Sequence, residues 1–113
     1  MPLVVGVLND EYRFIKTVNI DKSIQSALFR KLVTTAKYPN LGQASNDTED
    51  ITFTPEQVPA LVEDINRAVR SIAHMQKMAP EVKARLKTFL AELKEICRIA
   101  VEAGRNVEFV AGE

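Results

Sequence analysis

The chain has 113 residues, of which 15 are Lys or Arg and 15 are Asp or Glu, so its formal net charge is zero. An apolar content of 46% with 27% charged residues is typical of a folded globular protein and excludes wholesale disorder. The zero balance argues against a generally basic nucleic-acid-binding protein and against a polybasic membrane peptide. Because domains cluster near ~100–150 residues, we predict a single domain over residues 1–113.

The N-terminus and the cysteine content indicate a cytoplasmic protein. Cys97 is the single cysteine, so no intrachain disulfide can form, which fits a reducing compartment. The apolar run over residues 3–8 is short, no cationic segment precedes it, and acids follow it, so we expect no signal peptide. No apolar run approaches the ~20 residues that a membrane-spanning helix needs, so we expect no membrane partner.

Two strands are predicted at the start of the chain. Residues 3–8 are almost all apolar, and the run over residues 12–20 places apolar side chains at alternate positions. Asn9-Asp10 between the runs suits a tight turn, because both residues tolerate left-handed backbone conformations. We therefore predict a β-hairpin whose first strand lies inside the sheet, since both of its faces are apolar.

A helix and a long loop are predicted after the hairpin. Apolar residues recur at every fourth position from Ile24 to Leu32, which predicts a helix over residues 22–37. Pro39 ends this helix, because the residue before a proline is pushed out of the helical region. The small and polar residues 39–49 then predict the one long loop of the chain.

A second helix is predicted over residues 55–79. Thr54 can cap it, Pro55 suits its first position, and the side chain of Gln57 can bond back to complete a capping box. Pro59 would lie past the first turn of this helix, where we expect it to reduce stability.

A third helix and two more strands complete the predicted fold. Pro80 opens a helix over residues 80–103, Gly104 suits its C-terminal cap, and short strands are predicted at residues 51–53 and 107–110. We predict an α+β fold of order β-β-α-β-α-α-β, in which a small, mostly antiparallel sheet of about four strands packs on three helices. The last two helices should form a long antiparallel αα-hairpin, each about 36 Å long. A helical bundle that carries the β-hairpin is the alternative.

No catalytic constellation is visible in the sequence. His74 and Cys97 would lie ~18 Å apart along the helix pair, beyond hydrogen-bond reach, so we interpret Cys97 as an inert core thiol. One Cys and one His cannot build a structural zinc site, and no phosphate-binding loop or nucleophile elbow occurs. Glu63 and Asp64 are expected on the solvent side of their helix. We therefore predict no catalytic residue, no metal and no cofactor.

An acidic stretch stands out in the distribution of charge. Residues 47–64 carry six acidic groups and no basic group. These acids could keep a loop and an edge strand solvated, or they could form a docking patch for a basic partner. Their spacing does not match the twelve-residue loop of a helix–loop–helix calcium site, which argues against a cation. The candidate partner-binding residues of this acidic patch are Asp47, Glu49, Asp50 and Glu56.

A basic stretch follows the acidic one. Residues 65–90 carry six basic groups and one acidic group. In the predicted second helix the basic residues and His74 recur at steps of three and four, so they would share one helix face. This face could be solvated or could bind phosphates, but nucleic acid is disfavoured because no aromatic residue lies between Phe53 and Phe89. The residues of this alternative basic face are Arg67, Arg70, Lys77, Lys83 and Lys87.

The sequence favours a small soluble, non-enzymatic module that binds another protein. A stoichiometric inhibitor, such as an immunity-type protein that neutralises a toxin, is the most concrete form of this role. Two alternatives stay open: nucleic-acid or phosphate-ligand binding through the basic face, and an acid/base site in a cleft between sheet and helices. Self-association into a homodimer, through the helix pair or an edge of the sheet, also stays open.

Overall fold

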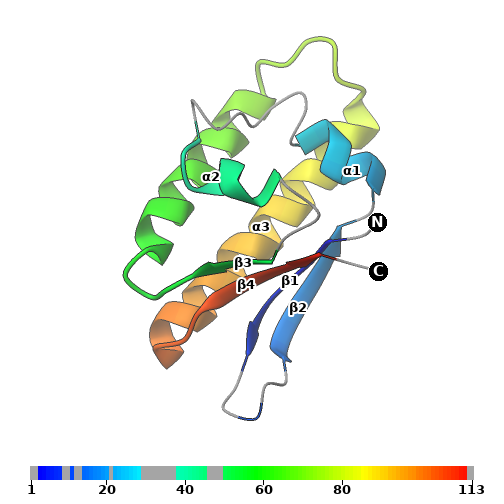
Figure 1. The fold of residues 1–113 in the computed structure, drawn as a ribbon. Coiled ribbons are helices and arrows are strands. Elements are labelled where there is room, and N and C mark those ends of the chain that lie inside the picture. The colour runs from blue at the N-terminus through cyan, green and yellow to red at the C-terminus, as the bar shows by residue number, and fades with distance from the viewer. Residues whose placement is uncertain are drawn as a thin grey trace.

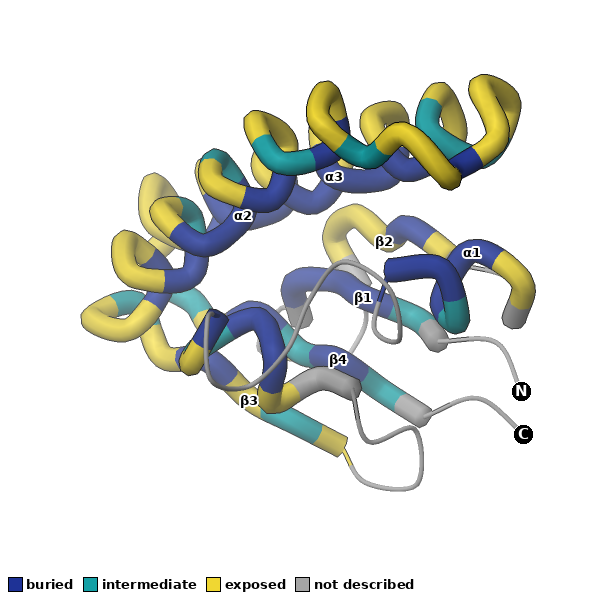
Figure 2. Tube along the Cα trace, turned by 90° about the horizontal axis from the view of Figure 1, so that it is seen from above, coloured by how far each residue is buried: buried dark blue, intermediate teal, exposed yellow. Residues whose placement is uncertain are grey.

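The computed structural model describes residues 3–8, 11, 14–20, 22–28, 38–45 and 50–111. Its elements are β1 (Leu3–Leu8), β2 (Phe14–Ile20), α1 (Lys22–Ser26), the 3₁₀ helix η2 (Leu41–Ser45), β3 (Ile51–Phe53), α2 (Val58–Ile72), α3 (Pro80–Ala103) and β4 (Val107–Ala111). A four-stranded antiparallel sheet in the order β2-β1-β4-β3 packs on the helices, with α2 and α3 over one face (Figures 1 and 2). The predicted α+β fold is therefore confirmed.

The first strand lies inside the sheet, as its two apolar faces predict. β1 pairs antiparallel with β2 on one side and with β4 on the other. In this register Val5 lies opposite both Val18 and Phe109, and all three side chains are buried. Asn9 and Asp10, where the turn is predicted, lie outside the described residues.

The helix and the loop that follow the hairpin are described in part. α1 forms within the predicted range, and Ile24 and Leu28 of the predicted apolar face are buried. The rest of that range, residues 29–37, is not described. Within the predicted loop, the chain forms η2, and Leu41 at its start is fully buried. This part of the loop is thus packed into the core.

α2 begins later than predicted, which changes the role of Pro59. Residues 54–57 form a turn, in which the N–H groups of Gln57 and Val58 donate to the carbonyl of Thr54 at 2.9 and 3.1 Å. The side chain of Gln57 accepts a hydrogen bond from the Thr54 N–H at 2.9 Å, so one half of the predicted capping box is present. Because the helix begins at Val58, Pro59 lies in its first turn, where an N–H has no intrahelical acceptor, and the expected loss of stability does not arise.

α2 also ends earlier than predicted, at Ile72. The N–H of His74 donates to a carbonyl three residues back at 3.0 Å, which tightens the chain as it leaves the helix. Ala79 has an extended conformation (φ −59°, ψ 141°), as a residue before a proline requires, and Pro80 then begins α3. The prediction that His74 and Lys77 continue a face of α2 is therefore wrong.

α3 has its predicted range and its predicted cap. Gly104 adopts the left-handed conformation (φ 66°), and the N–H of Arg105 donates to the carbonyl of Ala100 at 2.8 Å. α3 packs antiparallel to α2, which confirms the predicted αα-hairpin. The expected length of about 36 Å holds for the 24 residues of α3 and is wrong for the 15 residues of α2, which span about 22 Å. Within the described residues, no helix combines the length and the apolar character that crossing a lipid bilayer requires.

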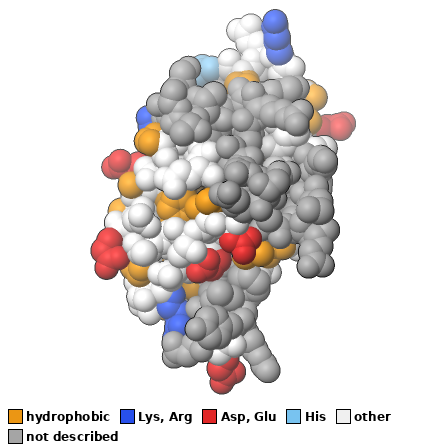
Figure 3. Space-filling view, viewed as in Figure 1, with side chains coloured by type: hydrophobic (Ala, Val, Ile, Leu, Met, Phe, Trp, Pro, Cys, Tyr) orange, Lys and Arg blue, Asp and Glu red, His pale blue; other side chains and the backbone are white. Residues whose placement is uncertain are grey.

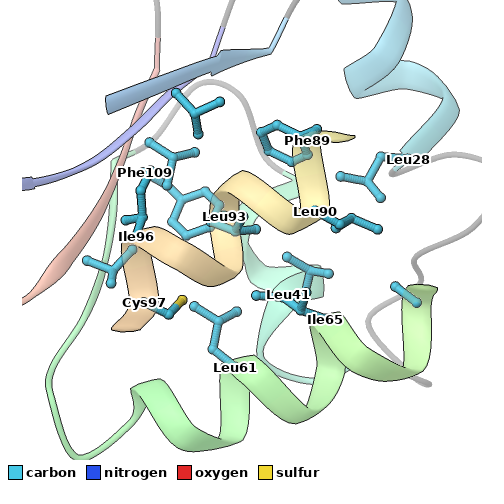
Figure 4. Packing of buried hydrophobic residues seen from close by; sticks show 14 of the residues in the cluster. Leu28, Leu41, Leu61, Ile65, Phe89, Leu90, Leu93, Ile96, Cys97 and Phe109 are labelled. Carbon is cyan, nitrogen blue, oxygen red and sulfur yellow. The ribbon is translucent and has the colours of Figure 1, made fainter. Parts of the chain in front are cut away.

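The core lies between the sheet and the helix pair (Figure 4). Phe53 and Phe109 meet edge to face with their ring centroids 5.5 Å apart, which joins β3 to β4. On α3, Leu93 and Ile96 are fully buried together with Cys97. Burial raises the pKa of the Cys97 thiol to about 12. The predicted core position of Cys97 is thus confirmed.

Candidate functional site

A buried carboxylate ties the predicted loop to α2. Asp64 is only 2% exposed, so the expectation that it lies on the solvent side of its helix is wrong. Its Oδ2 atom accepts hydrogen bonds from the backbone N–H groups of Asn40 and Leu41, at 2.8 and 3.0 Å. Its Oδ1 atom accepts one from Nη2 of Arg67 at 2.6 Å. These charge-assisted bonds satisfy a carboxylate that would otherwise be costly to bury.

Tyr38 completes this arrangement from the loop side. The guanidinium of Arg67 lies over the Tyr38 ring, 5.2 Å from its centroid, and the Tyr38 hydroxyl is 3.0 Å from Oγ of Ser71. We call Tyr38, Asp64, Arg67 and Ser71 the Asp64 network. Sequence reasoning missed it because the carboxylate meets backbone groups 23 and 24 residues away, beyond any helix or strand spacing.

Within the predicted basic face, the guanidinium of Arg67 is engaged by the Asp64 carboxylate and the Tyr38 ring, while its side chain stays 47% exposed. Arg70 is exposed on α2, whereas Lys77 is exposed in the connection between the two helices. Lys87 is exposed on α3, and Lys83 is half-buried there. Of the predicted row on the second helix, Arg67 and Arg70 thus lie on α2 and Lys77 lies beyond its end, while Lys83 and Lys87 lie across the turn on α3, as expected. Their binding of phosphates or nucleic acid stays a prediction.

The acidic patch is described only in part. Asp50 and Glu56 are exposed and flank β3, the short strand at one edge of the sheet. Asp47 and Glu49 lie outside the described residues. In the view of Figure 3, acidic side chains occupy several separate places on the described surface. No group of three or more His, Cys, Asp and Glu side chains among the described residues could hold a metal ion.

A groove of about 670 Å³ runs between the N-terminal half of α2 and the C-terminal half of α3. Val58 and Cys97 line it and are buried, while Val62 is half-buried. Pro59 and Val101 line it and are exposed, Val101 to 48%. A hollow apolar surface of this kind marks an interaction site more often than a single exposed side chain does. We call it the α2–α3 groove.

Charged side chains of α3 form the rim of the α2–α3 groove. Arg98 donates from Nε to Glu95 at 2.9 Å and from Nη1 to Glu102 at 2.7 Å. The hydrogen bond from Arg98 lowers the pKa of Glu95, and the hydrogen bonds to Glu95 and Glu102 raise the pKa of Arg98. Lys94 makes no ion pair with the described part of the chain. The rim therefore carries three groups that are already paired and one cation that can meet a partner.

A second hollow of about 300 Å³ lies where β2, α1 and α3 meet, and we call it the β2 hollow. Val18, Ile24 and Phe89 form its apolar part. Its ionisable lining residues are Arg85 and Glu92. The predicted alternative of an acid/base site between sheet and helices needs two facing acids, and the lining of this hollow has one.

Comparisons of this chain with protein-family models, with curated proteins and with solved structures find no match. Its fold and surfaces therefore define its class: an α+β protein whose described surface carries an apolar groove between two antiparallel helices.

Proposed function

We propose that the protein is a non-enzymatic interaction module that binds another polypeptide through the α2–α3 groove. The groove carries this proposal because apolar side chains open to solvent lie beside a charged rim. An amphipathic helix laid into the groove would cover Val62 and Val101 and direct its polar side towards the rim. A stoichiometric inhibitor that blocks its target by docking is one role that such a surface supports.

The ionisable groups of the groove support binding over catalysis. The pKa of the Cys97 thiol is raised to about 12 by burial, so this thiol is protonated at neutral pH and is a poor nucleophile. The pKa of Glu95 is lowered by the hydrogen bond from Arg98, so its carboxylate accepts protons weakly near pH 7. Groups of this kind orient and select a partner instead of transferring protons.

Contact with Val101 alone is too weak to hold a partner, so the partner has to cover the whole α2–α3 groove. Burying the exposed half of Val101 contributes about 1 kcal/mol, since a fully buried Val side chain contributes ~1.5–3 kcal/mol. A single contact of that size does not hold two chains together, because association itself costs several kcal/mol. Lys94 can add selectivity by pairing with an acid on the partner.

The exposed acids beside β3 have a different role in this proposal. Asp50 and Glu56 flank a short strand at the edge of the sheet. Charges beside an edge strand keep that edge from pairing with the strands of other chains. We therefore assign protein docking to the α2–α3 groove and edge protection to these acids.

Val101→Asp tests this assignment, with Val69→Asp as the matched control. Val69 is a helix residue exposed to 37% that does not line the groove. The tagged wild type and both variants capture proteins from a lysate of the source cell, which mass spectrometry identifies. We expect Val101→Asp to lose a partner that the wild type and Val69→Asp retain, while all three proteins keep their circular dichroism spectra. Equal capture by all three, or no partner for the wild type, would contradict the proposal.

A further inference from the structure

We propose that β2 is the self-association edge of this protein, and that two copies join β2 to β2 in antiparallel orientation to form one continuous sheet. β2 is an edge strand and pairs, within the described residues, with β1. Its seven residues present a row of backbone N–H and C=O groups along that edge, whereas β3 at the opposite edge has three residues. β2 is thus the longer edge for pairing, and none of its residues lines the α2–α3 groove.

The sequence of β2 selects one register for this pairing. A two-fold axis through Thr17 pairs all seven residues of the strand with their counterparts in the second copy, which is the largest overlap available. Ile15, which is 49% exposed, then lies opposite Asn19 of the second copy, and Lys16 lies opposite Val18. A register centred on Lys16 would place the two lysines directly opposite each other, which like-charge repulsion disfavours.

The β2 hollow is placed to receive the lysine of the second copy. Val18 lines this hollow and is buried, so it points towards the helices. Residues directly opposite each other in an antiparallel pair point to the same face of a sheet. Lys16 of the second copy, opposite Val18, therefore points to the helix-covered face beside the hollow, where the stem can pack on Phe89 and the ammonium can reach the exposed carboxylate of Glu92.

An inward-pointing lysine on an edge strand commonly prevents pairing, so its charge has to be offset. Within one chain, Arg98 lowers the pKa of the Glu95 carboxyl most, and the charge of Lys16 adds a smaller effect in the same direction. In the proposed dimer, each Lys16 would lie between Glu95 of its own chain and Glu92 of the second copy. The two halves of the contact are equivalent, as a two-fold symmetric dimer requires.

The proposal is tested by reversing the charges of Lys16 and Glu92, first singly and then together. Analytical ultracentrifugation over a range of concentrations measures dimerisation of each protein. We expect the wild type to dimerise, and Lys16→Glu and Glu92→Lys each to raise the dimer Kd at least tenfold, a ratio equivalent to about 1.4 kcal/mol. The double variant with both changes should regain most of the lost affinity, because the pair is restored with its charges exchanged. Lys87→Glu is the control, since Lys87 is exposed on α3 and does not line the hollow.

Three results would overturn the proposal. A wild type that stays monomeric at every concentration excludes the second copy as the occupant of this edge. A double variant as weak as either single variant excludes the contact between Lys16 and Glu92. A dimer that resists both charge reversals and dissociates with Val101→Asp assigns self-association to the α2–α3 groove. Glu92 is exposed on a helix, so Glu92→Lys remains informative even if Lys16→Glu does not fold.

Discussion

Removing the carboxylate of Asp64 should strongly destabilise the protein. Asp64→Ala leaves the backbone N–H groups of Asn40 and Leu41 and the guanidinium of Arg67 without their acceptor. A buried donor left unpaired costs ~1–3 kcal/mol. The Arg67 side chain is 47% exposed and can bond to water, so losing its carboxylate acceptor adds little to the destabilisation. The two backbone groups account for most of the effect, and we expect the free energy of unfolding to fall by about 3 kcal/mol.

Two further variants separate the parts of this effect. Asp64→Asn keeps an oxygen that can accept from the backbone N–H groups but turns an amide N–H towards Arg67, so we expect a smaller loss of about 1–2 kcal/mol. Arg67→Ala removes both the ion pair and the contact with the Tyr38 ring. Combined with Asp64→Ala in a double-mutant cycle, it should show a coupling of only about 0.5–1 kcal/mol, because the exposed guanidinium can bond to water instead.

Urea unfolding measures these differences as shifts of the midpoint at constant slope. Glu63→Ala is the matched control, because Glu63 is the neighbouring acid on α2 and is exposed. We expect it to change the free energy of unfolding by less than about 0.5 kcal/mol. If Asp64→Ala were as mild as Glu63→Ala, the Asp64 carboxylate would not be what holds the loop to α2.

The remaining predictions concern the buried thiol, the helix cap and the acidic patch. The pKa of Cys97 is raised by burial from 9.0 to about 12, so the stability that the thiol contributes is complete below pH 9 and falls as the pH rises from 9 towards 12. The wild type should therefore lose stability relative to Cys97→Ala over that pH range. An equal pH dependence of the two proteins would contradict the burial of the thiol. Gly104→Ala should reduce stability by about 1 kcal/mol through backbone strain alone, because φ is 66° and, apart from its chain neighbours, no described residue lies within 4 Å of the added Cβ. An unchanged thermal midpoint would argue against the left-handed cap. Glu56→Lys should leave both stability and partner capture unchanged, because Glu56 is exposed, whereas lost capture would return docking to the acidic patch.

Local patterns predicted the type and order of the strands and of the three α-helices, but they did not predict η2. Apolar residues on both faces of residues 3–8 predicted a strand inside the sheet, and β1 occupies that position. Pro80 and Gly104 marked both ends of α3, because proline suits a first helical position and glycine tolerates positive φ. Each of these signals depends on backbone conformations within a few residues, so no tertiary contact is needed to interpret it.

The same local signals predicted the two ends of α2 less accurately. The turn at residues 54–57 uses the residues of a capping box, and the helix itself begins at Val58. Its end at Ile72 precedes the proline that begins α3, because the chain needs several residues to reverse direction between antiparallel helices. An apolar stripe does not show where that reversal starts.

The sequence by itself thus determined an α+β protein with an antiparallel helix pair and a buried cysteine. Tertiary structure alone decided which charged residues are structural and which are open to a partner. Asp64 was expected on the solvent side of its helix, yet a loop more than 20 residues away packs over it, buries it and donates two backbone hydrogen bonds to it, while Arg67 pairs with its other oxygen. The α2–α3 groove and the β2 hollow likewise arise where separate elements meet. Their composition comes from the sequence, but their shape depends on contacts between segments that no local pattern encodes.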